Sequence, residues 1–230
     1  RAATCFKNVI INDFLHSNHA IYKAFFGKGE WDKKKTDKII QEYNLINGKD
    51  LRDNYFSRNF GGKYFSRSSA RVIGFVRDDI EKKKNILTEK EYYVLIASLL
   101  YAIDKIANTV GHYDAYFKKT LVDDTFAMRS ILPIQVEDVE VYREDANVLA
   151  KKIHTDVVYI DPPYNSRQYS RFYHILETLV KWNEPKLYGT ALKPAEENMS
   201  DYCRNTAKDK LAELVRDIDA KFLVVSYNNT

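Results

Sequence analysis

The stretch "VVYIDPPYNSRQYS", residues 157–170, constrains the fold of this chain more than any other. Its first four residues are β-branched or aromatic, and an acid followed by two of the chain's five prolines ends the run. A short apolar run of this kind is typical of a buried parallel strand. Each proline fixes its own φ and favours an extended residue before it, so Asp161 is held at the strand tip. Ligands bind at this edge of open α/β sheets, which makes it a candidate site.

Composition narrows the class of protein. With 230 residues, 45% of them hydrophobic and 30% charged, the chain can bury one good core and a smaller second lobe. No apolar stretch approaches the roughly 20 residues that span a bilayer, and the first residues lack the apolar core of a signal peptide. We therefore expect no membrane partner and a cytoplasmic location. Two cysteines and five scattered histidines lack the paired spacing of metal ligands, so no metal is predicted.

Strand and helix patterns alternate at both ends of the chain. Residues 8–14 predict a strand that ends at Asp13, and residues 15–25 suit one helical face. Strands follow at residues 139–145 and 157–161 with a short helix between them, and residues 209–230 give a last helix–strand pair. This alternation predicts an α/β sheet.

The middle of the chain has a different character. From Gly27 the sequence is rich in lysine and aromatic residues without strand alternation. A helix is predicted over 88–111, because Thr88 and Glu91 have the spacing of a capping box and apolar residues follow at helical intervals. We expect residues 1–26 and 135–230 to form one domain, and residues 27–134 to form an inserted, mainly helical lobe.

The side chains after the 157–160 strand suggest a chemistry. The Asp161 carboxylate and a backbone carbonyl beside the prolines are two acceptors, which suit an exocyclic amine. Tyr164 adds a flat face on which a base can stack, worth about 1–3 kcal/mol. The alternative is that Asp-Pro-Pro-Tyr is only a stiff turn between a strand and a loop.

These residues resemble a known family. The tetrapeptide from Asp161 to Tyr164 is similar to the catalytic motif of S-adenosylmethionine-dependent amino-methyltransferases, including some that act on ribosomal RNA guanine. The longer "VVYIDPPYNSRQYSRFYHILETLVKW" resembles adenine-specific DNA methyltransferases of restriction-modification systems, of the Dam and FokI type. Resemblance extends weakly over most of the chain, including "NTVGHYDAYFKK" and "VVSYNN".

The resemblance implies a fold, a cofactor and partners. The fold is a Rossmann-like methyltransferase sheet with a mainly helical insertion lobe for DNA recognition. The cofactor is S-adenosyl-L-methionine and the substrate is double-stranded DNA, with a cognate restriction endonuclease as a possible functional partner.

The resemblance also implies catalytic roles. The acid and the carbonyl of the following proline accept hydrogen bonds from the adenine amino group, and the aromatic ring stacks on an adenine turned out of the duplex. These roles fall on Asp161, Pro162 and Tyr164, with Pro163 completing the motif. Catalysis then rests on positioning and electrostatics and needs no covalent intermediate.

Cofactor contacts are implied for two other strand ends. Asp13 matches the family acid near the ribose and methionine part of the cofactor. Asp145 matches the acid that faces the cofactor's adenine amine, with Ala146 packing on the ring, and Asp161 borders the same site. Asp13 and Asp145 also suit a surface position or a helix N-cap. The family's glycine-rich turn is absent, and we expect it upstream of Arg1 because the chain opens with what resembles a second strand.

Two segments are candidates for DNA recognition. Between residues 54 and 71, five aromatic residues (Tyr55, Phe56, Phe60, Tyr64 and Phe65) interleave with the cations Arg58, Lys63, Arg67 and Arg71. This mixture suits phosphate contacts and base packing, but a solvated face over a small aromatic core has the same pattern. The segment "GHYDAYFKKT" resembles a DNA-contacting loop of Dam-like enzymes, which implies DNA binding by His112, Tyr113, Lys118 and Lys119.

Three functions remain open at this point. The first is a DNA adenine amino-methyltransferase. The second is a methyltransferase for RNA bases that uses the same tetrapeptide, against which the long insertion argues. The third is a catalytically silent nucleic-acid-binding relative, which the missing glycine-rich turn leaves possible. The formal charge of +4 does not decide between them.

Overall fold

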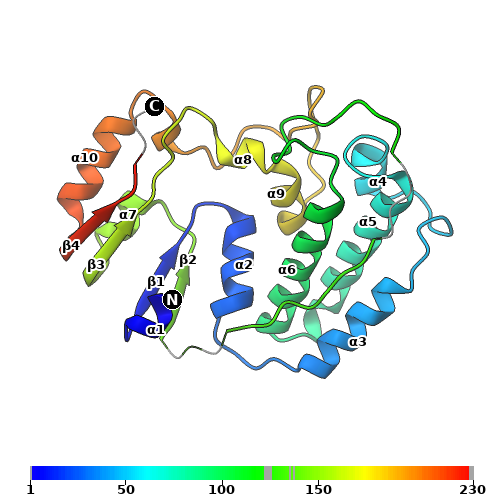
Figure 1. Ribbon diagram of the computed structural model, residues 1–230, viewed down its shortest axis with the longest axis horizontal. Coiled ribbons are helices and arrows are strands. Elements are labelled where there is room, and N and C mark those ends of the chain that lie inside the picture. Colours follow the sequence, from blue (N-terminus) through cyan, green and yellow to red (C-terminus); the bar gives the residue numbers. More distant parts are fainter. Residues whose placement is uncertain (1, 122–125, 135, 137, 228–230) are drawn as a thin grey trace.

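The structure, a computed structural model, describes residues 2–121, 126–134, 136 and 138–227. It is a mixed α/β protein in which the strands gather on one side and the long helices on the other (Figure 1). The elements follow in the order α1 (Ala2–Cys5), β1 (Val9–Asn12), α2 (His16–Phe26), α3 (Lys33–Asn44), α4 (Tyr55–Phe60), α5 (Arg67–Lys82), η1 (Lys83–Asn85), α6 (Glu89–Ile106), β2 (Val139–Tyr142), α7 (Ala146–Ala150), β3 (His154–Ile160), α8 (Tyr169–Phe172), α9 (His174–Lys181), η2 (Asp201–Cys203), α10 (Ala207–Asp217) and β4 (Asp219–Val225).

The strands form two separate parallel pairs. In one pair Val9 of β1 aligns with Val139 of β2, and in the other Val157 of β3 aligns with Phe222 of β4. Within the described residues no ladder joins the two pairs, so the α/β sheet expected from the sequence is present as two small, separate parallel pairs.

One face of the β3–β4 pair is covered and the other is bare. Ile160 packs with Leu214 of α10 and Ala150 of α7, and Val158 lies against the same cluster. On the opposite face Tyr159 is 63% exposed and Phe222 is 66% exposed. A parallel strand is buried only when both faces of its sheet are covered. Because one face of the β3–β4 pair is uncovered, β3 is less buried than its apolar sequence predicts.

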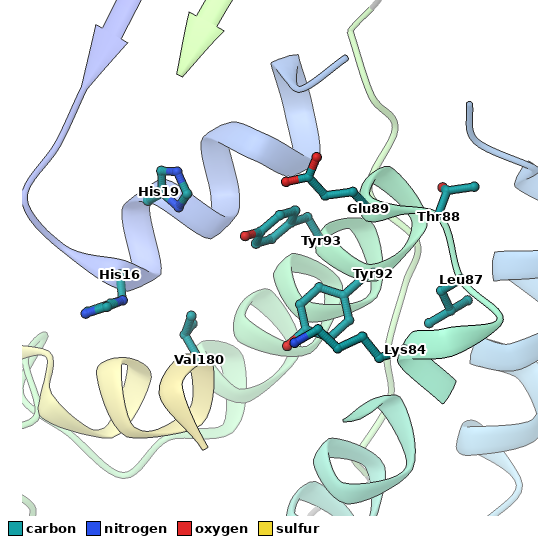
Figure 2. Close-up of a pocket in the computed structure, with 9 residues that line it drawn as sticks. All are labelled: His16, His19, Lys84, Leu87, Thr88, Glu89, Tyr92, Tyr93 and Val180. Carbon is teal, nitrogen blue, oxygen red and sulfur yellow. The ribbon is translucent and has the colours of Figure 1, made fainter. Parts of the chain in front are cut away.

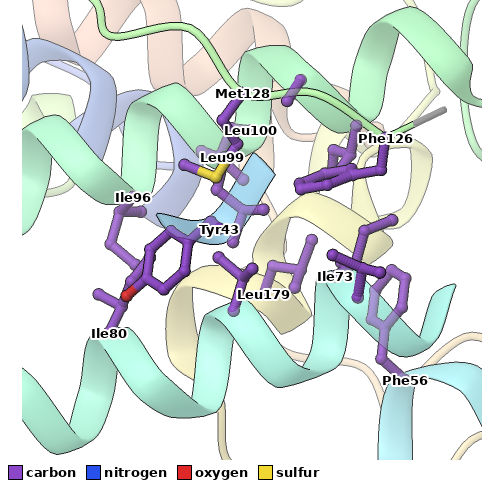
Figure 3. Close-up of a cluster of buried hydrophobic side chains, with 14 of the residues drawn as sticks. Tyr43, Phe56, Ile73, Ile80, Ile96, Leu99, Leu100, Phe126, Met128 and Leu179 are labelled. Atoms are coloured by element: carbon purple, nitrogen blue, oxygen red, sulfur yellow. The ribbon is translucent and has the colours of Figure 1, made fainter. Parts of the chain in front are cut away.

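The main hydrophobic core lies among the helices. Side chains from α3, α4, α5, α6 and α9 meet there, and Figure 3 shows Tyr43, Phe56, Ile73, Leu99 and Leu179 among them. Ala20 of α2 belongs to the same cluster. The core therefore takes side chains from both of the segments that the sequence assigns to different domains.

The predicted helix after Thr88 is confirmed as α6. The Thr88 hydroxyl accepts a hydrogen bond from the Glu91 amide at 3.1 Å, and the Glu91 carboxylate accepts one from the Thr88 amide at 2.9 Å. Leu95 and Leu99, on the predicted apolar face, are fully buried. The helix ends at Ile106, several residues before the predicted end at Gly111. No helix in the described part of the chain is long and apolar enough to cross a membrane.

Candidate active site and DNA-binding surface

The Asp-Pro-Pro-Tyr segment lies at the carboxyl end of β3, where the sequence predicts it. The strand ends at Ile160, whose carbonyl accepts a hydrogen bond from the Ser226 amide at 2.9 Å. Asp161 is exposed, Pro162 is buried and the Tyr164 side chain is 45% exposed. Among the described residues, no hydrogen bond or ion pair engages the Asp161 carboxylate. A free acceptor and a ring face are therefore open to a ligand at this edge.

The chain after this motif is tied to a later loop. The side chain of Gln168 donates to the Ser200 carbonyl and accepts from the Ser200 amide, both at 2.8 Å. Arg171 donates to the Pro194 carbonyl at 2.6 Å. Burial raises the pKa of Tyr169, and the nearby Tyr164 and Asp161 raise it further, so these groups share one environment. These contacts fix the path of the chain between the motif and α9.

The two acids expected to bind a cofactor lie at the ends of neighbouring strands. Asp13 follows β1, and its amide donates to the carbonyl of Tyr142 in β2 at 3.4 Å. Its carboxylate accepts from the Leu15 amide and the Asn18 side chain, each at 2.8 Å, and burial raises its pKa. Asp13, after β1, and Asp145, after β2, thus lie at the same edge of the β1–β2 pair.

Asp145 is also a helix cap. Its Oδ1 atom accepts from the amides of Asn147 at 2.9 Å and Val148 at 3.3 Å at the start of α7. The N-cap role that the sequence left open is therefore confirmed. Within the described residues its Oδ2 atom has no donor, and Ala146 beside it is partly exposed.

A third carboxylate, Glu177 of α9, was not singled out from the sequence. It is 5% exposed, and its two oxygens accept from the amides of Ser17 at 2.8 Å and His16 at 3.0 Å. Burial raises the pKa of Glu177, and Asp13 raises it further. Asp13 and Glu177 together receive the amides of residues 15–17, which joins the start of α2 to the helix that follows the motif. No local pattern could reveal this contact, because the partners lie far apart in the chain.

Three arginines of the 54–71 segment contact one residue, Asp53. Asp53 accepts from Arg71 at 2.8 Å and from Arg67 at 3.1 Å, and its backbone carbonyl accepts from Arg58 at 3.2 Å. The guanidinium groups of Arg71 and Arg67 hold the pKa of Asp53 well below its usual range. The charges of Arg67 and Arg71 are therefore partly neutralised within the protein, whereas Arg58 bonds only a backbone carbonyl and Lys63 is partly exposed.

The aromatic residues of the same segment form a core. Phe56, Phe60, Tyr64 and Phe65 are almost completely buried and contact one another's rings. Of the two interpretations left open by the sequence, the small aromatic core is confirmed for these four rings. They pack inside the helices and offer no surface to a base.

The predicted DNA-contacting loop is divided between core and surface. Tyr113 is 1% exposed, and its hydroxyl donates to Asp104 at 3.1 Å, so a direct DNA contact by this ring is corrected to a packing role. The His112 ring stacks on Phe172 of α8, with centroids 4.6 Å apart and planes 8° apart. Lys118 and Lys119 are exposed.

A groove of about 490 Å³ lies elsewhere, between α2, α6 and α9. Figure 2 shows His16 and His19 on one side of it and Tyr92, Tyr93 and Lys84 on the other. Burial, together with Arg143 and Lys181, lowers the pKa of His16 to about 4. None of the residues expected to act in catalysis lines this groove. Within the described residues no cluster of three potential metal ligands occurs.

Comparison with known proteins identifies relatives of the chain. It is 36% identical over 179 residues to the modification methylase StsI of Streptococcus sanguinis, a match that covers 72% of this chain and 26% of the relative. It is 32% identical over 232 residues to the type II methyltransferase M.NlaIII of Neisseria lactamica, covering 97% and 69% of the two chains. M.FokI of Planomicrobium okeanokoites is 33% identical over 179 residues, covering 72% and 27%. The chain thus spans about a quarter of StsI and M.FokI and about two thirds of M.NlaIII.

The family model gives the broadest match. The model of the D12 class N6 adenine-specific DNA methyltransferases matches residues 1–228. No solved structure matches the chain significantly. The match extends from β1 through the Asp-Pro-Pro-Tyr segment to β4. This chain belongs to the D12 class of N6 adenine-specific DNA methyltransferases.

Proposed function

We propose that the protein transfers a methyl group from S-adenosyl-L-methionine to the exocyclic amino group of adenine in double-stranded DNA. The observation that carries this proposal is the Asp161-Pro162-Pro163-Tyr164 segment at the end of β3, in which Asp161 and Tyr164 are exposed, in a chain of the N6 adenine-specific DNA methyltransferase family. The same family membership makes an RNA base substrate or a silent relative the less favoured alternative.

The motif supplies acceptors and a stacking surface. The Asp161 carboxylate and the Pro162 carbonyl accept the two amino hydrogens of adenine, which directs the nitrogen lone pair toward the methyl donor. The carboxylate also stabilises the positive charge that develops on that nitrogen during transfer. Tyr164 holds the extruded base by stacking, worth about 1–3 kcal/mol, which partly offsets the cost of flipping.

The residues at the ends of β1 and β2 fit a nucleoside cofactor. S-adenosylmethionine, when bound, supplies an electrophilic methyl group. The Asp145 Oδ2 atom has no donor among the described residues and can accept from an adenine amine, with Ala146 against the ring. Each Asp13 oxygen receives one hydrogen bond and can accept another from a ribose hydroxyl. We propose that Asp161, at the end of β3, borders the same cofactor site.

The strand pairs suit a Rossmann-like sheet. In the common doubly wound order 3-2-1-4-5-6, strands 3 and 2 lie on one side of strand 1 and strands 4 and 5 on the other. The pairs β2–β1 and β3–β4 match those two sides, and β1 and β3 are the inner strands in the view of Figure 1.

The domain division belongs to the same proposal. Residues 1–26 and 135–230 carry the catalytic part, and residues 27–134 form the helical lobe for DNA recognition. Arg58, Lys63, Arg67 and Arg71 lie on this lobe, and His112, Lys118 and Lys119 lie on the loop that follows α6.

The cellular role follows from the names of the relatives. StsI is a modification methylase and M.FokI and M.NlaIII are type II methyltransferases, so we propose a restriction-modification system with a cognate endonuclease as partner. An enzyme that modifies cellular DNA works where that DNA is, and we propose the cytoplasm.

The test is methyl transfer with identification of the product. The protein, expressed from its complete gene, is incubated with methyl-labelled cofactor and either unmethylated duplex DNA or ribosomal RNA, and the nucleosides are then separated. We expect label in N6-methyladenine from DNA. Label on guanine from RNA would show that the protein is an RNA base methyltransferase. DNA binding without any label would show that it is a catalytically silent nucleic-acid-binding relative.

A further inference from the structure

The cations of the described part of the chain differ in whether a carboxylate neutralises them. Arg67 and Arg71 share Asp53, and Lys193 pairs with Asp114. Arg167, three residues after Tyr164, is exposed and pairs with no carboxylate within the described residues. Its charge is therefore available to an external anion.

Arg167 is held in place although it is exposed. Its guanidinium carbon lies 5.5 Å from the centroid of the Phe172 ring, its amide donates to the Asn165 side chain at 2.9 Å, and its carbonyl accepts from the Cys203 thiol at 3.2 Å. A cation resting on an aromatic face and fixed at its backbone loses less freedom when it binds a ligand.

The same ring connects Arg167 to the loop that carries two more free cations. Phe172 stacks on His112, and its carbonyl accepts a hydrogen bond from the Tyr113 amide at 2.8 Å. Lys118 and Lys119 lie further along that loop, exposed and without a carboxylate partner among the described residues. Arg167, just after the motif, and Lys118 and Lys119, on the loop that contacts Phe172, are thus cations without a carboxylate partner among the described residues.

We propose that Arg167 contacts a backbone phosphate of the DNA strand that carries the target adenine, and that the Phe172 ring positions its guanidinium group. The inference rests on the proposed function and assigns a residue to it. Arginine presents a planar fork that matches phosphate oxygens, and phosphate contacts fix the register of a protein on DNA. Because Arg167 follows the motif closely, this contact would hold the DNA backbone next to the extruded base.

The experiment measures how binding of a fluorescent duplex of mixed sequence depends on salt, between about 50 and 200 mM. The Arg167→Gln variant should bind more weakly, and the magnitude of its slope of log affinity against log salt should fall by about 0.9 relative to the parent. Arg167→Lys should restore the parental slope, because lysine keeps the charge.

A matched control separates Arg167 from arginines in general. Arg129 is also exposed and unpaired among the described residues, but its segment is tied to the helical lobe by hydrogen bonds from Met128 to Asn44 and from Ile131 to Ser98. Arg129→Gln should keep the parental slope. Melting temperatures of all variants should match the parent, since both arginines lie on the surface.

The outcomes distinguish the inference from the function on which it rests. A parental slope for Arg167→Gln, with normal DNA binding by the parent, would overturn the phosphate contact and leave the proposed function intact. Equal loss in Arg129→Gln would also overturn it, because the effect would then be one of net charge. Absence of DNA binding by the parent protein would overturn the proposed function and this inference together.

Discussion

Two carboxylates of the β3 segment differ in what they contact. Asp156, within the strand, accepts a hydrogen bond from Lys221 of β4 at 2.6 Å, and this lysine lowers its pKa. Asp161, just past the strand, has no such partner within the described residues. A carboxylate left without an internal partner at a strand end is available to a substrate, which supports the catalytic role proposed for Asp161.

Replacing Asp161 with alanine should abolish most turnover. We expect kcat to fall by about 100- to 1000-fold, the usual effect of removing one group that stabilises transition-state charge. Cofactor affinity, measured by calorimetry, should change little because the carboxylate acts on the adenine amine. Asp156→Ala is the matched control and should keep its turnover, since an exposed ion pair contributes little. A near-parental rate for Asp161→Ala would contradict the mechanism.

Tyr164 should act through its ring face. Tyr164→Phe and Tyr164→Trp should keep substantial activity, while Tyr164→Ala should lose it. With 2-aminopurine at the target adenine, the Ala variant should give a brighter flipped state, because the quenching ring is gone. Since the side chain is 45% exposed, the melting temperature should stay almost unchanged. A large fall in melting temperature with unchanged fluorescence would show that Tyr164 is a packing residue.

At the scale of elements, α6 and α2 begin in different ways. The cap of α6 is local, since Thr88 and Glu91 are three residues apart and satisfy each other's amides. The first turn of α2 instead receives the carboxylate of Glu177 from α9. A local cap can be predicted from sequence because its two residues are a fixed number of positions apart. A cap supplied by another helix has no fixed separation in the chain, so the sequence does not reveal it.

Glu177→Gln should destabilise the protein by about 1–3 kcal/mol. Glutamine keeps the size of the side chain but places an amino group against one of the two buried amide donors of α2, which leaves that donor unsatisfied. Urea denaturation measures the change in the free energy of unfolding. Glu42→Gln, on the exposed side of α3, should change it by no more than about 0.5 kcal/mol. Equal effects of the two substitutions would show that the cap contributes nothing.

At the scale of the whole molecule, a buried histidine makes stability depend on pH. His174, at the start of α9, is fully buried, and its Nδ1 atom lies 3.1 Å from the Arg171 carbonyl. Burial, with smaller effects from Lys193 and Arg171, lowers its pKa from 6.5 to about 4. The unfolded chain therefore binds the proton more readily than the folded protein between these two pH values.

The free energy of unfolding should fall as pH decreases from about 6.5 to about 4, the interval set by the lowered pKa of His174. His16 acts in the same direction, while the raised pKa of Glu177 acts in the opposite one. His174→Gln isolates the effect: the variant should be less stable than the parent at pH 7, and the difference should shrink by pH 5. A difference that stays constant across this range would contradict the assignment.

The sequence by itself determined the strand end at Asp161, the alternation of strands and helices, and the capped helix α6. Each of these depends on residues that are neighbours in the chain, so spacing and residue type are enough to predict them. The resemblance of the motif to a methyltransferase family was confirmed by the match over residues 1–228.

Only the tertiary structure decided which polar groups are free to act. The sequence shows Arg67, Arg71 and Arg167 as equivalent cations, yet Asp53 engages the first two and leaves the third exposed over Phe172. The family resemblance implied a DNA contact by Tyr113, but this side chain is buried and its hydroxyl donates to Asp104. The physical reason is that burial and neutralisation depend on groups brought together from distant parts of the chain, and no local pattern records those partners.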